Sequence, residues 1–234
     1  MEHTTTDKSK EKIQAMFDEI APTYDKLNHL FTLKIDIKWR REIVKYLIGK
    51  KFHAADILDL ASGTGDLTAE LLTLDPKKII AADISDKMLE VQRAKIKDTR
   101  LQLVNADSSQ LPFEDDSFDL VTIGFGIRNF ELIEKSLNEI RRVLKRGGKL
   151  IILEMFKGSG IKTKIFNLYF GKVMPFFGNR ISKSKYAYSY LFKSVDGFYS
   201  VKDFINLCQS NGFKVEYSKN NFLGIVNTIV FEVS

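Results

Sequence analysis

The chain has 234 residues, 44% of them hydrophobic, which is enough apolar material for one α/β domain with a sizeable core. Its formal net charge of +6 is compatible with nucleic acid, an anionic membrane surface or neither as a partner. The single cysteine, Cys208, has no cysteine or histidine cluster around it, so we expect neither a disulfide framework nor a metal site. Residues 1–12 are polar, and no stretch reaches the roughly 18 apolar residues of a membrane-spanning helix. These features predict a cytoplasmic protein, soluble or peripheral to a membrane.

The first 50 residues are predicted to be helical. Apolar residues recur at helical spacing in residues 13–20, and Pro22 helps to end this helix. A second helix is predicted over residues 39–48. Because residues 1–50 precede the first strand, we expect them to fold over the ligand site as a lid. Taken by itself, Tyr24 is most simply a packing residue of this lid.

A glycine-rich turn, Ala61–Gly65, follows the first predicted strand. Gly63 and Gly65 carry no Cβ, so backbone N–H groups of the turn can approach a ligand closely. Eighteen residues after Gly65, a second apolar run ends in Asp83, where nucleotide-binding folds place a carboxylate for ribose hydroxyls. We therefore predict a cofactor-binding α/β core over residues 51–155.

The next elements bring a second acid to the predicted ligand site. Residues 85–97 predict a helix capped by Ser85, and residues 101–104 predict a short strand that leads to Asp107. The loop after this strand lies beside the adenine ring in such folds, where a carboxylate can accept from the exocyclic amine. Without the surrounding pattern, Asp107 would more simply be a solvated loop residue.

The strand over residues 120–123 ends in a loop that contains Arg128 and Asn129. Ligands of open α/β sheets collect at the carboxyl ends of strands, so we expect both side chains at the reacting face. The core is completed by a helix over residues 132–144, a terminating turn at 146–148 and a strand over 149–155.

Residues 156–200 form an insertion rich in aromatic and basic residues, with Asp196 as its only acid. A structureless loop of this length is unlikely in a compact domain, so we expect helices that cover the substrate. The apolar run at 161–177 is interrupted by lysines, which suits contact with an apolar substrate or a bilayer interface. A core helix beneath a basic surface fits the same composition equally well.

The C-terminal region, residues 201–234, is predicted to be a helix and a β-hairpin that complete the sheet. Six residues separate the strands predicted at 213–218 and 225–233, too few for a parallel crossover, so the strands must be antiparallel if they pair. A third glycine, which the dinucleotide motif needs, is replaced by Thr68. This layout resembles the class I S-adenosylmethionine-dependent methyltransferases, with a Rossmann-like, mostly parallel seven-stranded sheet, helices on both faces and an antiparallel last strand. The run Asp59–Gly65 resembles their first motif.

Six stretches together resemble the quinone-biosynthesis C-methyltransferases, which methylate demethylmenaquinol or the methoxybenzoquinol precursor of ubiquinone. They are Tyr24–Asn28, Trp39–Arg41, Leu58–Leu67, Phe125–Asn129, Arg142–Gly148 and Tyr188–Ser194. Lys34 and Phe156 depart from the family's usual glycine and serine. The resemblance implies S-adenosyl-L-methionine as the cofactor, with Thr64, Asp83, Asp107 and Ser108 as its contacts beside the turn residues Gly63 and Gly65 that we already place at the ligand. It implies C-methylation of demethylmenaquinol to menaquinol, with the ubiquinone precursor as the alternative.

The implied chemistry needs an electron-rich ring, so the substrate must be the reduced quinol. The resemblance puts Arg128, Asn129 and Tyr24 around the quinol oxygens as the catalytic residues. Because an arginine is a poor proton acceptor, we assign Arg128 to stabilising the developing oxyanion, with water or a nearby carboxylate taking the proton.

The sequence is also compatible with methyl acceptors other than a quinol. A different small molecule or RNA would suit the same core, although no RNA-binding module is apparent. A cofactor-binding module without catalysis is disfavoured by the intact motif residues Asp59, Gly63, Gly65 and Asp83. We expect a polyprenylated quinol as substrate, transient contact with the inner face of the cell membrane and no nucleic acid partner. The chain is compatible with a homodimer.

Overall fold

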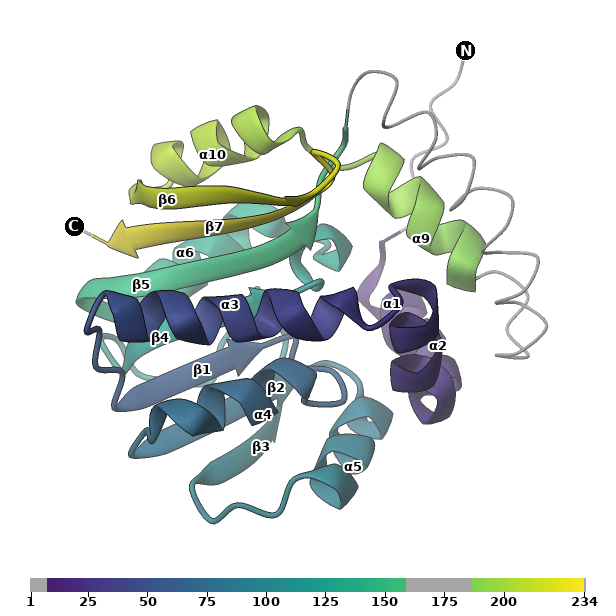
Figure 1. The fold of residues 1–234 in the computed structure, drawn as a ribbon, viewed down its shortest axis with the longest axis horizontal. Helices are drawn as coiled ribbons and strands as arrows, with labels where there is room; N and C mark the ends of the chain where they lie inside the picture. Colours follow the sequence, from purple (N-terminus) through teal and green to yellow (C-terminus); the bar gives the residue numbers. More distant parts are fainter. Residues whose placement is uncertain (1–7, 159–186, 234) are drawn as a thin grey trace.

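The computed structural model describes residues 8–158 and 187–233, and their strands form one seven-stranded sheet in the order β3-β2-β1-β4-β5-β7-β6 (Figure 1). The strands are β1 (Asp56–Leu60), β2 (Lys78–Asp83), β3 (Leu101–Asn105), β4 (Phe118–Gly124), β5 (Leu144–Met155), β6 (Phe213–Phe222) and β7 (Val226–Val233). Strands β1 to β5 are parallel, whereas β7 is antiparallel to both β5 and β6. The predicted sheet with a reversed last strand is confirmed.

Helices cover both faces of this sheet. The α-helices are α1 (Lys10–Ile20), α2 (Tyr24–Phe31), α3 (Ile35–Gly49), α4 (Asp66–Leu71), α5 (Asp86–Lys95), α6 (Ile133–Val143), α9 (Ala187–Asp196) and α10 (Val201–Ser210), with 3-10 turns η1 (Ala21–Thr23), η2 (Leu72–Leu74) and η3 (Ile127–Asn129). One core layer joins the sheet to α3, α4 and α5, and the other joins it to α6 and α10. Burial on both faces explains why β1, β4 and β5 read as nearly continuous apolar runs.

The carboxyl ends of the parallel strands point toward α1, α2 and α9, which lie at one end of the molecule (Figure 1). The N-terminal residues predicted as a lid are therefore beside the edge where ligands of such sheets collect. Two details differ from the sequence prediction. Residues 24–31 form a helix that was not predicted, and α3 begins at Ile35 rather than at Trp39. An i,i+4 ion pair between Asp36 and Arg40 stabilises the earlier start.

The residues between α2 and α3 explain why this boundary was hard to predict. Leu33 and Lys34 both have left-handed backbone, with φ of 51° and 62°. Glycine adopts this conformation most readily, and the family resemblance has glycine at the position of Lys34. The chain keeps the turn without the residue that usually signals it.

The predicted cap at Ser85 is confirmed, since its Oγ accepts a hydrogen bond from the backbone N of Met88 at the start of α5. Ser200 caps α10 in the same way by accepting from the backbone N of Asp203. The prediction of a turn at residues 146–148 is wrong, because they lie within β5. Leu144 already pairs with Phe118 of β4, and the next pair is Leu120 with Lys149. The extra residues of β5 between these two pairs, which include the glycines, form an irregularity in the register.

Much of the insertion, including the lysine-interrupted run at 161–177, falls outside the described residues. Of its aromatic residues, Phe156 and Phe198 are buried, and both rings pack against Phe204 of α10. These two side chains are core residues rather than part of a substrate cover.

Candidate active site

A cavity lies where β1, β2 and β4 end. Its wall includes five of the six predicted cofactor residues, namely Gly63, Thr64, Asp83, Asp107 and Ser108. Asn129 and Tyr24 from the predicted catalytic set also line it. Further wall residues come from the N-terminal segment and from the loops after β1 and β4: Lys8, Lys10, Phe17, Arg40, Asp59, Phe125 and Glu131.

Asp83 fixes the glycine turn at the edge of this cavity through a hydrogen bond. The backbone N of Gly63, at φ 56°, donates to Asp83 Oδ2 at 2.8 Å. Gly65, at φ 87°, does not line the cavity, and a Cβ there would stand 2.6 Å from Cγ of Gln92 in α5. The structure therefore gives Gly65 a packing role between the turn and α5.

Asp83 is 8% exposed and sits between two backbone donors, because Ser85 N donates to its Oδ1 at 2.9 Å. Burial raises the pKa of this carboxyl above its ordinary value, and the backbone hydrogen bonds from Ser85 and Gly63 act against the rise. Each carboxylate oxygen has a second lone pair, and Asp83 lines the cavity. This geometry suits acceptance from vicinal hydroxyls.

Asp59 of β1 is buried at the floor of the same cavity. Its oxygens accept from Thr68 Oγ1 at 2.6 Å and from Thr122 Oγ1 at 2.8 Å, which ties β1 to α4 and β4. Burial raises the pKa of Asp59 to about 6, and the two threonine hydroxyls oppose that rise. The first-motif acid thus holds the turn in place.

The N-terminal residues close over the far end of the cavity. Lys10 Nζ lies 3.2 Å from Asp107 Oδ2, and the backbone N of Lys10 donates to Glu131 at 3.1 Å. Burial alone would raise the pKa of Asp107, but hydrogen bonds from Ser109 and Lys10 hold it below its ordinary value. Ser108 shares a hydrogen bond with Ser136 of α6 at 2.9 Å. Lys10 was missed by sequence reasoning, since nothing local marks it as a partner of Asp107.

A second, smaller cavity adjoins the first. It is lined by Tyr24, Asn28, Thr32, Asp36, Arg40, Phe125, Arg128, Met155 and Leu191. Tyr24, Arg40 and Phe125 line both cavities, so they form the shared wall. The guanidinium of Arg40 lies 5.7 Å from the centre of the Phe125 ring, which is the contact distance of a cation–π pair. Burial raises the pKa of Tyr24, and the charge of Arg128 partly offsets the rise.

Arg128 borders this second cavity and not the first, which separates it from Asn129. Its Nη1 donates to Glu154 Oε1 at 2.7 Å and to the carbonyl of Phe125 at 2.7 Å. Arg128 is 5% exposed and Glu154 is fully buried. Burial lowers the pKa of Arg128, but the charge and hydrogen bond of Glu154 together with Tyr24 and Tyr190 outweigh this effect, so the pKa is raised above its ordinary value.

A buried donor of Arg128 has no partner among the described residues. Its Nε is buried and makes no hydrogen bond to a described residue, and such an atom in a native fold calls for a partner. Glu154, which holds the guanidinium, was missed by sequence reasoning. The available signal was its position near the end of β5, the strand next to β4.

Asn129 is held by a hydrogen bond from Tyr190 of α9. Tyr190 OH donates to its Oδ1 at 3.1 Å, and Asn129 also lines the first cavity. Burial raises the pKa of Tyr190 to about 12, so this hydroxyl remains a donor at neutral pH. The structure thus brings Tyr24 and Asn129 to one cavity and Tyr24 and Arg128 to the other.

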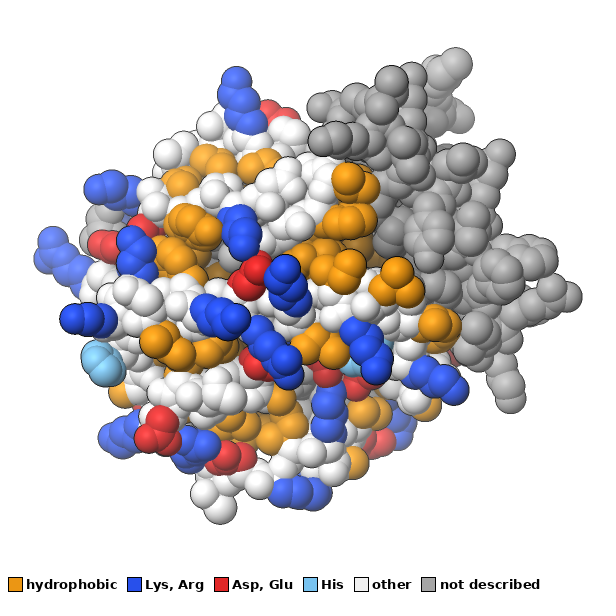
Figure 2. All heavy atoms as spheres, in the orientation of Figure 1, with side chains coloured by type: hydrophobic (Ala, Val, Ile, Leu, Met, Phe, Trp, Pro, Cys, Tyr) orange, Lys and Arg blue, Asp and Glu red, His pale blue; other side chains and the backbone are white. Residues whose placement is uncertain are grey.

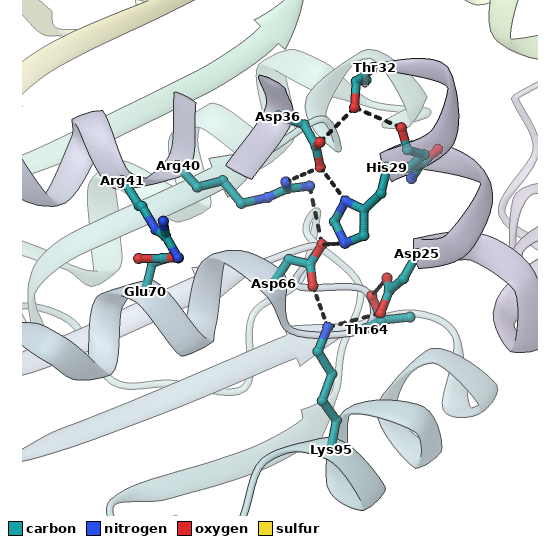
Figure 3. Close-up of polar contacts among 11 residues, drawn as sticks. Asp25, His29, Thr32, Asp36, Arg40, Arg41, Thr64, Asp66, Glu70 and Lys95 are labelled. Carbon is teal, nitrogen blue, oxygen red and sulfur yellow. Dashed lines mark hydrogen bonds and ion pairs between the residues drawn. The ribbon is translucent and has the colours of Figure 1, made fainter. Parts of the chain in front are cut away.

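A polar network ties α2 and α3 to the glycine turn, the start of α4 and α5 (Figure 3). Asp25 accepts from Thr64 of the glycine turn and pairs with Lys95 of α5, which also pairs with Asp66. Arg40 bridges Asp36, at 2.5 Å, and Asp66, at 3.6 Å.

His29 Nδ1 lies 2.9 Å from Asp36 and its Nε2 lies 3.5 Å from Asp66. These three side chains are close enough together to ligate a metal ion. Arg40 and Lys95 already supply positive charge to both carboxylates, so the arrangement is accounted for as an ion-pair network.

The geometry can be compared with known proteins. Residues 5–230 match the model of the ubiE/COQ5 methyltransferase family. A protein of Bacteroides fragilis named demethylmenaquinone methyltransferase is 39% identical over 222 residues, 92% of this chain and 90% of its own. A protein of Geobacter sp. named ubiquinone/menaquinone biosynthesis C-methyltransferase UbiE is 42% identical over 211 residues, 87% of this chain and 88% of its own.

A solved structure from Thermotoga maritima, described as a SAM-dependent methyltransferase, superposes with a TM-score of 0.65 at 20% identity. The match covers 94% of this chain and 99% of that one. At this identity the likeness concerns the fold, and it confirms the class I methyltransferase architecture predicted from the sequence.

Proposed function

This chain belongs to the ubiE/COQ5 methyltransferase family and is a methyltransferase; on that basis we propose that it C-methylates demethylmenaquinol to menaquinol with S-adenosyl-L-methionine as the methyl donor. The observation that carries the choice of acceptor is the second cavity, which Arg128 lines and which adjoins the cofactor cavity across Tyr24 and Phe125; the buried Nε of Arg128 has no hydrogen-bond partner among the described residues. The names of the relatives support the same acceptor.

The first cavity fits the proposed donor. Asp83 offers carboxylate lone pairs to ribose hydroxyls, and Asp107 offers an acceptor to an adenine amine once Lys10 shares or releases it. Gly63 carries no side chain into the space. When bound, S-adenosyl-L-methionine supplies a methyl group that is already activated by its sulfonium.

The remaining task of the protein is alignment and control of charge. A hydroquinol ring becomes more nucleophilic as its hydroxyl approaches the phenolate form, so a fixed donor beside that oxygen favours reaction. Arg128 is held by Glu154, and its Nε–H makes no hydrogen bond within the described part of the chain. Tyr24 lies in the wall between the cavities, where it can orient the ring and exclude water.

Atoms and charge balance without a redox partner. A bond forms between the methyl carbon and the ring carbon, the bond from that methyl to sulfur breaks, and the ring carbon loses its proton. The proton leaves to water or to a nearby carboxylate, because Arg128 cannot accept it. An oxidised quinone is electron-poor and lacks the hydroxyl, so only the reduced substrate is competent.

The polyprenyl tail of such a substrate is a membrane lipid. We propose that the insertion at 156–200, apart from its core residues Phe156 and Phe198, contacts the tail and that the enzyme visits the inner face of the cell membrane transiently. The predicted basic positions Lys162, Lys164 and Lys172 lie outside the described residues. No helix in the described part of the chain is long and apolar enough to cross a membrane.

The test is methyl transfer from radiolabelled S-adenosyl-L-methionine to demethylmenaquinol and to the ubiquinone precursor, each with and without a reductant. We expect label in menaquinol only when the reductant is present. The name of the Geobacter relative favours the ubiquinone precursor as a second acceptor. Transfer to RNA and to neither quinol would contradict the proposal.

A further inference from the structure

We propose that the turn between α2 and α3 docks the enzyme on an anionic lipid bilayer. This inference rests on the proposed function, in which the acceptor is a lipid. The docking surface, here called the α2–α3 tip, consists of Leu30, Leu33 and Ile35 with the lysines Lys26, Lys34 and Lys38.

Large apolar side chains are concentrated at the tip. Leu33 is 78% exposed, Leu30 is 53% exposed and Ile35 is 38% exposed. Single exposed leucines are ordinary on a protein surface, but three within six residues form a patch that calls for a partner.

The backbone supports the same conclusion. Leu33 and Lys34 are held in left-handed conformations, which residues with a Cβ adopt only where the surrounding structure imposes them. The turn is fixed by backbone hydrogen bonds from Lys34 N to the carbonyl of His29 and from Ile35 N to that of Thr32. The strained turn therefore presents Leu33 to the outside as a rigid feature.

The charges of the tip are all of one sign. Lys26, Lys34 and Lys38 are exposed, and none of them makes an ion pair with a described residue. The one acid between residues 26 and 38 is Asp36, which is 2% exposed and is neutralised by Arg40. Hydrophobic and Lys or Arg side chains lie next to one another over this end of the molecule (Figure 2).

Leucine and isoleucine flanked by lysines suit one partner chemistry in particular. Apolar side chains can enter the boundary of the acyl chains while lysine stems reach to anionic headgroups. A protein partner would need acidic groups opposite the lysines and a fitted apolar pocket, whereas a bilayer supplies both without shape complementarity. The charge complementarity therefore favours lipid.

The tip also lies on the outer side of the helices that wall the second cavity. Tyr24, Asn28 and Thr32 of α2 and its C-cap, together with Asp36 of α3, line that cavity from within. A lipid whose ring occupies the cavity would have its tail near the surface that we assign to the bilayer. Docking at the tip thus orients the acceptor cavity toward the source of its substrate.

The test is sedimentation of the full chain with vesicles of phosphatidylglycerol and phosphatidylcholine, compared with pure phosphatidylcholine vesicles, at low and high salt. The main variant is Leu33→Asn, because asparagine tolerates left-handed backbone better than leucine and the fold is expected to persist. Removing most of a leucine's apolar contact should weaken binding about tenfold. Replacing Lys26, Lys34 and Lys38 with glutamine should weaken it by about fivefold per lysine at low salt.

The matched control is Ile48→Asn. Ile48 is 60% exposed at the other end of α3, beside Lys45 and Lys50, so it tests whether any exposed apolar residue among lysines would serve. We expect Ile48→Asn to bind vesicles like the parent. Leu30→Gln is the second tip variant, and circular dichroism with thermal melting checks that each variant is folded.

Three outcomes would overturn the docking proposal: no binding of the parent to anionic vesicles at low salt, parent-like binding by Leu33→Asn and Leu30→Gln, or an equal loss in Ile48→Asn. Activity on a short-tailed quinol in detergent separates this failure from failure of the proposed function. If the tip variants lose vesicle binding but keep that activity, both proposals stand. If the parent binds vesicles but methylates no quinol, docking stands and the acceptor is wrong.

Discussion

Replacing Glu154 with glutamine should destabilise the protein strongly. Glu154 is fully buried, and its Oε1 accepts from Arg128 Nη1 at 2.7 Å and from the backbone N of Met155 at 2.6 Å. Its Oε2 accepts from the backbone N of Arg128 at 3.3 Å. Glutamine keeps the shape, but it removes the charge and turns an NH2 group toward one of these donors. The guanidinium would then be a buried cation without a counter-ion.

Loss of one partner from a buried ion pair costs about 3–5 kcal/mol. For a domain of this size, each kcal/mol lowers the melting temperature by roughly 2–4 °C, so we expect a decrease of roughly 6–20 °C. Calorimetry and urea unfolding would measure the change, with an unaltered urea m-value indicating that the folded state is otherwise intact.

A double-mutant cycle supplies the control. Replacing a buried pair with apolar residues of similar volume is often neutral, so the double variant Arg128→Met with Glu154→Leu should be more stable than either Arg128→Met or Glu154→Leu alone. The coupling between the two sites should then be large. A destabilisation below about 1 kcal/mol in Glu154→Gln, or additive effects in the cycle, would refute the view that Glu154 compensates the charge of Arg128.

Three further changes test the site. Asp83→Ala should weaken S-adenosylhomocysteine binding by about 1.5–3 kcal/mol in calorimetry, and unchanged affinity would remove Asp83 from the cofactor site. Arg128→Lys should cut turnover by about tenfold or more with cofactor affinity nearly intact. Equal losses of turnover and of cofactor affinity would indicate that Arg128 contacts the cofactor rather than the quinol. The folded pKa of Asp59, about 6, is above its ordinary 3.8, so its contribution to stability is full below pH 3.8 and falls as pH rises toward 6. Asp59→Asn should therefore gain about 3 kcal/mol relative to the parent between about pH 4 and pH 6, at 1.36 kcal/mol per pKa unit, and a flat difference across that range would contradict burial as the cause.

Local chemistry explains the parts of the fold that could be predicted. A strand that ends in glycines, the caps at Ser85 and Ser200, and a six-residue connection that forbids a parallel crossover each depend on neighbouring residues only. The α2 helix and the early start of α3 were not predictable in this way. Their link passes through Lys34 in a left-handed conformation that nothing in its own side chain signals.

The sequence by itself determined the antiparallel relation of the last two strands, the glycine turn and the strand-end position of Asp83, because these follow from connection length, turn chemistry and periodicity; the whole sheet was expected only from the family resemblance. Only the tertiary structure decided that Arg128 and Asn129, adjacent in the chain, border different cavities. It also decided that Glu154 holds Arg128 and that Lys10 reaches Asp107. Those pairs are 26 and 97 residues apart, and residues so distant in the chain meet only because the parallel strands end at one edge of the sheet while the N-terminal helices fold back over that edge.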